Sequence, residues 1–206
     1  MRASAIIFAL FMALLAGPTL AADAPTAAVA EDKAEALEKK VVNDAPPPKK
    51  NEALTSGEVM AVDPSGQAPM DDSITCLART IYWEAKQADA KDMSAVASVV
   101  LNRLGQDGFP DTICGVVKQG VESKSCQFSW WCDGRPDQVE EKDRYDIAKE
   151  IARKALNQQL KDPTNGALYF HDRSARPAWA RALVCSWSSL PRVMQVSRPR
   201  ALTPST

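Results

Sequence analysis

Glu84 is the carboxylate in this sequence whose neighbours best suit it to acid catalysis. It follows Tyr82 and Trp83 and stands about one helical turn beyond Ile81, beside an apolar stripe. A carboxyl group at the edge of a buried face loses part of its hydration, which raises its pKa and keeps it protonated near neutral pH. Such a group can act as a general acid. Taken alone, the segment also fits a solvated glutamate that pairs with a basic side chain.

A second cluster, residues 125–134, is the densest group of aromatic and polar side chains in the chain. Aromatic faces pack on pyranose rings, while amide and hydroxyl groups bond the ring substituents. Gln127, Phe128 and Ser129 are therefore candidates for a sugar-binding surface, on an extended loop or short hairpin that turns at Asp133. The alternative is that the aromatic side chains of this cluster belong to the core.

The elements that must position these residues are mostly helical, because apolar residues recur at helical spacing over most of the segment that follows residue 73. Ser73 and Asp111 are expected N-caps, and Gly105 is expected to end a helix. The polar pair Asn102 and Arg103 either pairs within the structure or lines a cleft. The expected elements are helices at 74–85, 90–104, 112–118 and 137–160, and a strand at 167–171.

The first 72 residues read as two flanking segments. Residues 1–22 have the basic start, short apolar centre and small-residue end of a secretory signal peptide, which predicts export to the periplasm or the medium. The alternative is a retained membrane anchor. Residues 23–72 are rich in Ala, Pro and charged residues and have almost no aromatics, so we expect a disordered linker. The folded domain is then expected to span residues 73–182.

Composition limits the partners of this domain. The 206 residues are 45% hydrophobic and carry a net charge of -1, enough for one core and without a strong attraction to nucleic acid or anionic lipid. His171 is the single histidine of the sequence, which disfavours a catalytic zinc site. We therefore expect no metal and no cofactor.

Five cysteines in an exported chain favour disulfides with one cysteine left over. Cys76 can join the first helix to Cys114, and Cys126 can close a small loop with Cys132. Sequence does not fix this connectivity, because four cysteines allow about three pairings. Cys185 stands apart from the other four.

Five blocks follow one another along the chain: LARTIYWEA at 77–85, VASVVLNR at 96–103, FPDTICGVV at 109–117, CQFS at 126–129, and GALYFH at 166–171 with PAWA at 177–180. In this order they resemble the SleB-type cell wall hydrolases, the family of the spore cortex-lytic enzymes. The resemblance runs from about Cys76 to Arg181. It implies a lysozyme-like, mainly helical α+β single domain that cleaves the glycan strands of peptidoglycan, with Glu84 as the catalytic acid.

The resemblance also implies a mechanism, that of a lytic transglycosylase. We expect the protein to be a monomer. Glu84 then acts as acid and as base between N-acetylmuramic acid and N-acetylglucosamine. His171 is either a groove residue or a structural one. The residues expected in the substrate groove are Tyr82, Gln127, Phe128, Ser129, Tyr169, His171 and Trp179.

Three alternatives remain beside this reading. A hydrolytic muramidase needs a second carboxylate, for which Asp89, Asp92 and Asp133 are the candidates. A binding module would hold peptidoglycan without cutting it. A metal-dependent amidase is disfavoured by the single histidine.

The end of the chain departs from the family pattern. Residues 183–206 lack the closing Ile-Gly-x-His-x-Phe-Tyr-like segment, and no acidic residue follows Asp172. We expect an atypical tail, produced by a changed reading frame or by divergence, in which a final strand of the groove is absent.

Overall fold

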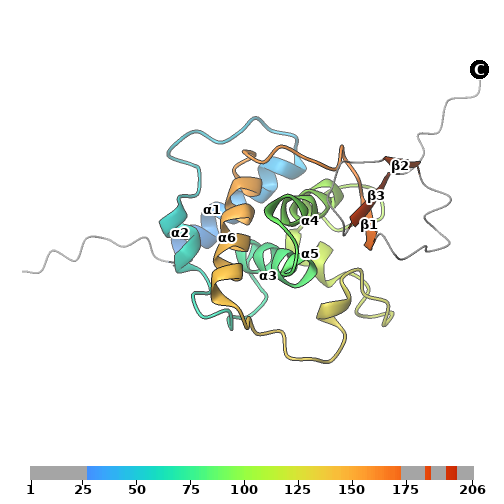
Figure 1. The fold of residues 1–206 in the computed structure, drawn as a ribbon. Helices are drawn as coiled ribbons and strands as arrows, with labels where there is room; N and C mark the ends of the chain where they lie inside the picture. Colours follow the sequence, from blue (N-terminus) through green and yellow to red (C-terminus); the bar gives the residue numbers. More distant parts are fainter. Residues whose placement is uncertain (1–26, 173–183, 187–193, 199–206) are drawn as a thin grey trace, which may run out of the picture.

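The computed structural model describes residues 27–172 and the backbone of two short segments, 184–186 and 194–198. Helices dominate these ranges, and a small antiparallel sheet with strand order β1-β3-β2 lies to one side of them (Figure 1). This confirms the mainly helical α+β class. The helices are α1 (Ala27–Val42), α2 (Ser56–Ala61), α3 (Ser73–Ala85), α4 (Ala90–Arg103), α5 (Ile113–Lys118) and α6 (Lys142–Leu156), with a short 3-10 helix η1 (Ser129–Trp131).

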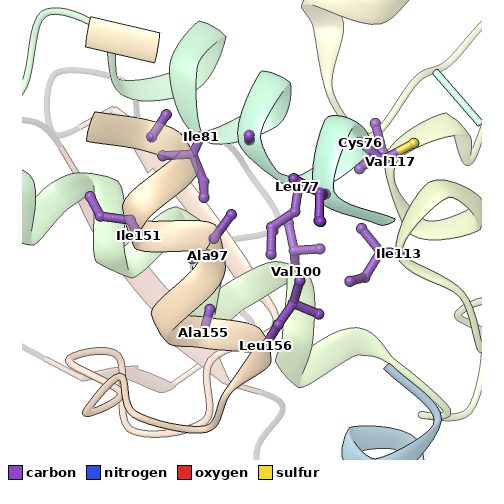
Figure 2. Packing of buried hydrophobic residues seen from close by; sticks show 14 of the residues in the cluster. Cys76, Leu77, Ile81, Ala97, Val100, Ile113, Val117, Ile151, Ala155 and Leu156 are labelled. Carbon is purple, nitrogen blue, oxygen red and sulfur yellow. The ribbon is translucent and has the colours of Figure 1, made fainter. Parts of the chain in front are cut away.

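Helix α3 is the centre of the fold. It packs against α4, α5 and α6, and every residue from Ser73 to Tyr82 is buried. Figure 2 shows Leu77 and Ile81 of α3 among apolar side chains of the three neighbouring helices. Because α3 is enclosed along most of its length, its last turn, which carries Glu84, has a fixed position.

The helix N-caps differ by one residue from those expected. The side chain of Asp72, not Ser73, caps α3 by accepting a hydrogen bond from the Thr75 backbone N–H at 2.8 Å. Thr112 caps α5 in the same way in place of Asp111. In both cases the cap is the residue with extended backbone, which aims its side-chain oxygen at the free N–H groups of the first turn.

The expected disordered linker is wrong for the residues that the structure describes. From residue 27 onward the segment contains α1 and α2, and Ala30, Ala34 and Leu37 of α1 join the main core, as does Val59 of α2. These apolar residues form a narrow stripe at helical spacing. The average composition of the segment hides that stripe, and the rest of the domain supplies the surface that buries it.

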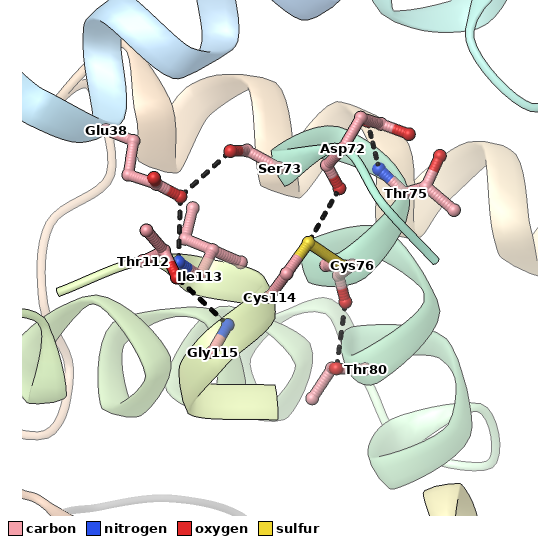
Figure 3. Close-up of a disulfide and its surroundings, with 10 residues drawn as sticks. All are labelled: Glu38, Asp72, Ser73, Thr75, Cys76, Thr80, Thr112, Ile113, Cys114 and Gly115. Carbon is pink, nitrogen blue, oxygen red and sulfur yellow. Dashed lines mark hydrogen bonds between the residues drawn. A yellow bond between two sulfur atoms is a disulfide. The ribbon is translucent and has the colours of Figure 1, made fainter. Parts of the chain in front are cut away.

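Glu38 fixes α1 to two other helices through a buried carboxylate. One oxygen accepts hydrogen bonds from the Ser73 hydroxyl and from the Ile113 backbone N–H, both at 2.8 Å (Figure 3). Burial raises the pKa of Glu38, and the two hydrogen bonds oppose that rise. One side chain therefore links α1 to the first turns of α3 and α5.

Two disulfides join the pairs that the sequence analysis named. Cys76 of α3 is bonded to Cys114 of α5, with Cα atoms 5.3 Å apart (Figure 3). Cys126 is bonded to Cys132 and closes the loop that contains η1. The first bridge connects elements 38 residues apart, so it restrains the unfolded chain more than the second, whose cysteines are 6 residues apart.

Replacing both Cys76 and Cys114 by Ala should therefore lower the free energy of unfolding by about 2–4 kcal/mol, as measured by urea denaturation. The matched control replaces Cys126 and Cys132 by Ala, for which the chain-entropy argument predicts a smaller loss. An equal loss in the two double variants would contradict the assignment of the first bridge as the main covalent restraint.

The expectation that the tail lacks a closing strand is wrong. The backbone of 184–186 forms β2 (Val184–Ser186) and that of 194–198 forms β3 (Met194–Arg198), which lies between β2 and β1 (Tyr169–Asp172). In β3, residue Val196 is opposite Phe170 on one side and Ser186 on the other. Three strands pair here because β3 offers hydrogen-bonding groups on both of its edges.

The expected signal peptide, residues 1–22, lies outside the described ranges.

Candidate active site

Glu84 is the next-to-last residue of α3 and is half-buried. Burial raises the pKa of Glu84 to about 7, while the positive charge of Arg103 works in the opposite direction. In the part of the chain that the structure describes, the Glu84 side chain has no hydrogen bond or ion pair. The Glu84 carboxyl group is therefore partly protonated at neutral pH, and no described side chain bonds to it.

Arg103, the last residue of α4, is the charged group that acts on Glu84. Its side chain is buried, and its Nε donates a hydrogen bond to the Leu168 carbonyl oxygen at 2.8 Å. Three rings surround the guanidinium, those of Phe109 and Phe128 at 5.2 Å and that of Tyr169 at 5.7 Å from its carbon. Burial lowers the pKa of Arg103 to about 10, so the group still carries its charge at neutral pH.

The sequence predicted that Arg103 either pairs within the structure or lines a cleft. This prediction came from the polar pair at the end of an otherwise apolar helix. The three rings come from residues 6 to 66 positions away along the chain, counting from 103 to 109 and to 169, so helical periodicity could not reveal the cage that they form.

Tryptophans pack beside the end of α3. The rings of Trp83 and Trp130 stack with centroids 6.4 Å apart, and Trp131 meets Trp130 edge-on at 5.9 Å. The ammonium group of Lys86 lies 4.2 Å from the centre of the Trp83 ring. The disulfide-closed loop is thereby held against the helix that carries Glu84.

Two of the expected groove residues are core residues instead. Tyr82 is fully buried, and its hydroxyl oxygen accepts hydrogen bonds from the backbone N–H groups of Glu140 and Glu141. Phe128 is also fully buried and faces Arg103 and Phe170. Neither ring presents a surface to a glycan, so we correct these two assignments. Aromatic type alone does not distinguish a sugar platform from core packing.

The other expected groove residues fall into three groups. Gln127 and Ser129 are exposed on the disulfide-closed loop. Tyr169 and His171 are half-buried on β1, and the Tyr169 ring is part of the cage around Arg103. Trp179 lies outside the described residues. For the exposed and half-buried residues the groove role stays a prediction.

The three candidate second carboxylates have local structural roles or neighbours. Asp89 caps α4 through the backbone N–H groups of Lys91 and Asp92, at 2.8 and 3.0 Å. Asp92 is buried within α4. Asp133 accepts a hydrogen bond from the Arg135 backbone N–H on an exposed loop. None of them is among the groups that shift the pKa of Glu84.

The described residues contain no cluster of three or more His, Cys, Asp or Glu side chains arranged to hold a metal ion. Nor does any helix in these ranges combine the length and apolar content needed to cross a bilayer. One hollow of about 670 Å³ lies between α1 and the starts of α3 and α5, and Glu84 does not line it. The candidate chemistry therefore rests on Glu84 and its neighbours.

The raised pKa of Glu84 makes stability depend on pH. Its ordinary pKa of 4.5 rises to about 7 on folding, so the folded state holds the proton more tightly than the unfolded state. That contribution is fully present below about pH 4.5 and is lost as pH rises through about 7. Glu84→Gln, which cannot ionise, should therefore gain thermal stability relative to the unmodified protein between pH 5 and 8. A difference in melting midpoint that does not change with pH would contradict this.

Comparison with known proteins assigns a family to the region that follows Glu84. Residues 87–187 match the model of a family described as Cell Wall Hydrolase. This part of the chain belongs to the cell wall hydrolase family. The cell wall hydrolase match begins three residues after Glu84, so the role of this residue is not part of that match.

Several spore cortex-lytic enzymes resemble part of this chain. The enzyme of Oceanobacillus iheyensis is 34% identical over 128 residues, which cover 60% of this chain and 42% of the relative. That of Halalkalibacterium halodurans is 32% identical over 114 residues, 53% of this chain and 30% of the relative. The chain thus spans less than half the length of these relatives.

Two solved structures are similar to the structure of this chain. One is the catalytic domain of the Bacillus cereus SleB protein, with a TM-score of 0.47 and 24% identity over 61% of this chain and 89% of that one. The other is the catalytic domain of the germination-specific lytic transglycosylase SleB from Bacillus anthracis, with the same TM-score and identity over 66% of this chain and 99% of that one.

Proposed function

We propose that this protein cleaves the glycan strands of peptidoglycan as a lytic transglycosylase. The observation that carries the proposal is Glu84, a carboxyl group with a pKa raised to about 7 at the fixed end of the central helix. The family of residues 87–187 and the names of the spore cortex-lytic relatives support a cell wall substrate. Export through residues 1–22 is part of the same proposal.

The first half of the proposed reaction needs a protonated carboxyl group. Glu84 donates its proton to the glycosidic oxygen between N-acetylmuramic acid and N-acetylglucosamine while the bond from that oxygen to the muramyl anomeric carbon breaks. Positive charge develops on the anomeric carbon. A pKa of about 7 leaves a useful fraction of the acid form at neutral pH, which a solvated glutamate would not.

The second half needs the same group as a carboxylate. Glu84 takes the proton from the muramyl 6-hydroxyl as its oxygen bonds to the anomeric carbon, which gives a 1,6-anhydro end and restores the acid. Arg103 stabilises the carboxylate between the two proton transfers, because its charge lowers the pKa of Glu84. No water is consumed, so one carboxyl group suffices.

The structure gives a reason to prefer this route to hydrolysis. Hydrolytic glycosidases use two carboxyl groups that lie about 5–9.5 Å apart. The three sequence candidates for the second group act as a helix cap, a buried helix residue and a loop residue, and none affects the pKa of Glu84. Glu84 therefore has no evident carboxylate partner among the described residues.

Mass spectrometry of the products released from purified sacculi tests the proposal. Soluble muropeptides that end in 1,6-anhydro-muramic acid, each lighter by one water than the reducing form, are the expected result. Reducing ends would show a hydrolytic muramidase instead. Binding to sacculi without any soluble product would point to a peptidoglycan-binding protein.

A further inference from the structure

Arg103 holds a buried hydrogen-bond donor that the described part of the chain leaves unused. Its Nε donates to the Leu168 carbonyl oxygen, but its Nη1 is buried and has no hydrogen-bond partner there. Only 3% of the residue is exposed to solvent. Buried charged donors are almost always paired in folded proteins, so the unused N–H group calls for a partner.

The orientation of Arg103 is fixed, which suits it to recognise a ligand. The rings of Phe109, Phe128 and Tyr169 lie around the guanidinium, and the Nε hydrogen bond sets its rotation. The planar guanidinium group therefore has a fixed orientation before any ligand binds, and the aromatic rings exclude water from part of it. A hydrogen bond made in such surroundings is stronger than one in water.

The unused donor belongs to the neighbourhood of Glu84. The charge of Arg103 acts on the Glu84 carboxyl group, yet no ion pair joins the two in the described residues. Phe128 of the ring cage stands two residues before Trp130, whose ring stacks on that of Trp83, the residue before Glu84. The cage therefore lies beside the end of α3 that carries Glu84.

We propose that Arg103 is a substrate-binding residue whose Nη1 donates a hydrogen bond to the acetamido carbonyl oxygen of the sugar that Glu84 acts on. This rests on the proposed function. The acetamido group is attached to C2, next to the anomeric carbon that bears the glycosidic oxygen, so one sugar ring offers both acceptors to the end of α3. An amide carbonyl is also a stronger acceptor than the sugar hydroxyls nearby.

Ligand binding in a Glu84→Gln background, where no cleavage interferes, tests this inference. The probes are the tetramer of N-acetylglucosamine and the tetramer of glucose, which is neutral and lacks the acetamido group. Adding Arg103→Lys keeps the charge and removes Nη1. It should weaken binding of the N-acetylated tetramer about tenfold or more and leave binding of the glucose tetramer unchanged. Arg153→Lys is the matched control, because Arg153 of α6 is also a partly buried arginine, and its Nε donates to Glu150.

Each outcome of this experiment is decisive. Unchanged affinity for the N-acetylated tetramer, or an equal loss for both tetramers, overturns the assignment of Arg103. If the Glu84→Gln protein binds neither tetramer, the glycan function itself fails. Should Arg103→Lys not fold, a crystal structure of the Glu84→Gln protein with the N-acetylated tetramer decides the matter. An acetamido oxygen within about 3.2 Å of Nη1 supports the inference, and one elsewhere overturns it.

Discussion

Glu84→Gln should reduce the release of soluble muropeptides from sacculi at least about a hundredfold, because general acid–base catalysis contributes about 10²–10⁴-fold and both proton transfers are assigned to this side chain. The amide has nearly the shape of the carboxyl group but can neither donate that proton nor accept one. The rate is measured from the muropeptides that appear in solution, and binding to sacculi is measured separately and should persist.

Glu35→Gln is the matched control for this change. Glu35 is also a helical glutamate, but it is exposed and pairs with Lys39 four residues away, an interaction that contributes little. The control should keep full activity. Retention of activity in Glu84→Gln would exclude Glu84 as the acid. A lower melting midpoint would show that the variant lost activity because it unfolds.

The same assignment predicts the pH dependence of the unmodified enzyme. The acid form of Glu84 begins the reaction, and its pKa is raised to about 7, so the rate should fall as pH rises through that value. A rate that keeps rising well above pH 7 would show that another group supplies the proton.

Asp63→Ala should cause the largest loss of stability among single substitutions, about 3–5 kcal/mol in the free energy of unfolding. Asp63 is buried, and one carboxylate oxygen accepts from Arg79 Nε at 2.9 Å and from the Tyr145 hydroxyl at 2.8 Å. The other oxygen accepts from the backbone N–H groups of Gln67 and Ala68. Removing the carboxylate leaves the buried Arg79 charge without its counter-ion.

Urea denaturation of three variants separates the charge from the shape of this side chain. Asp63→Asn keeps the size and loses the charge, so it should destabilise the protein nearly as much as Asp63→Ala. Replacing Asp63 by Leu together with Arg79 by Met should recover much of the loss, because no buried charge then remains unpaired. If Asp63→Ala cost less than about 1 kcal/mol, like an exposed pair, the network would not be a main support of the fold.

This network also positions the helix that carries Glu84. Arg79 and Trp83 of α3 both donate to the Asp137 carbonyl oxygen, at 2.8 and 3.2 Å, so α3 is bonded to the segment before α6 by residues just ahead of Glu84. Removing the Asp63 carboxylate should therefore make the position of Glu84 less fixed, in addition to weakening the core.

The sequence by itself determined those features that depend on neighbours along the chain. Glu84 is located on α3 by helical spacing, and its partial burial follows from the apolar stripe and the aromatic residues beside it. The helical elements around it were found for the same reason, since periodicity in hydrophobicity is a local signal. The five resembling blocks added the family and the proposed role of Glu84 as a single acid.

Tertiary structure alone decided which side chains meet. Helix α1 is fixed through Glu38, whose partners Ser73 and Ile113 lie 35 and 75 residues away. Tyr82 and Phe128 are core residues, and Arg103 is a caged cation beside the acid, because of contacts between distant segments. Such contacts depend on the packing of whole helices, and a pattern with a period of a few residues carries no information about them.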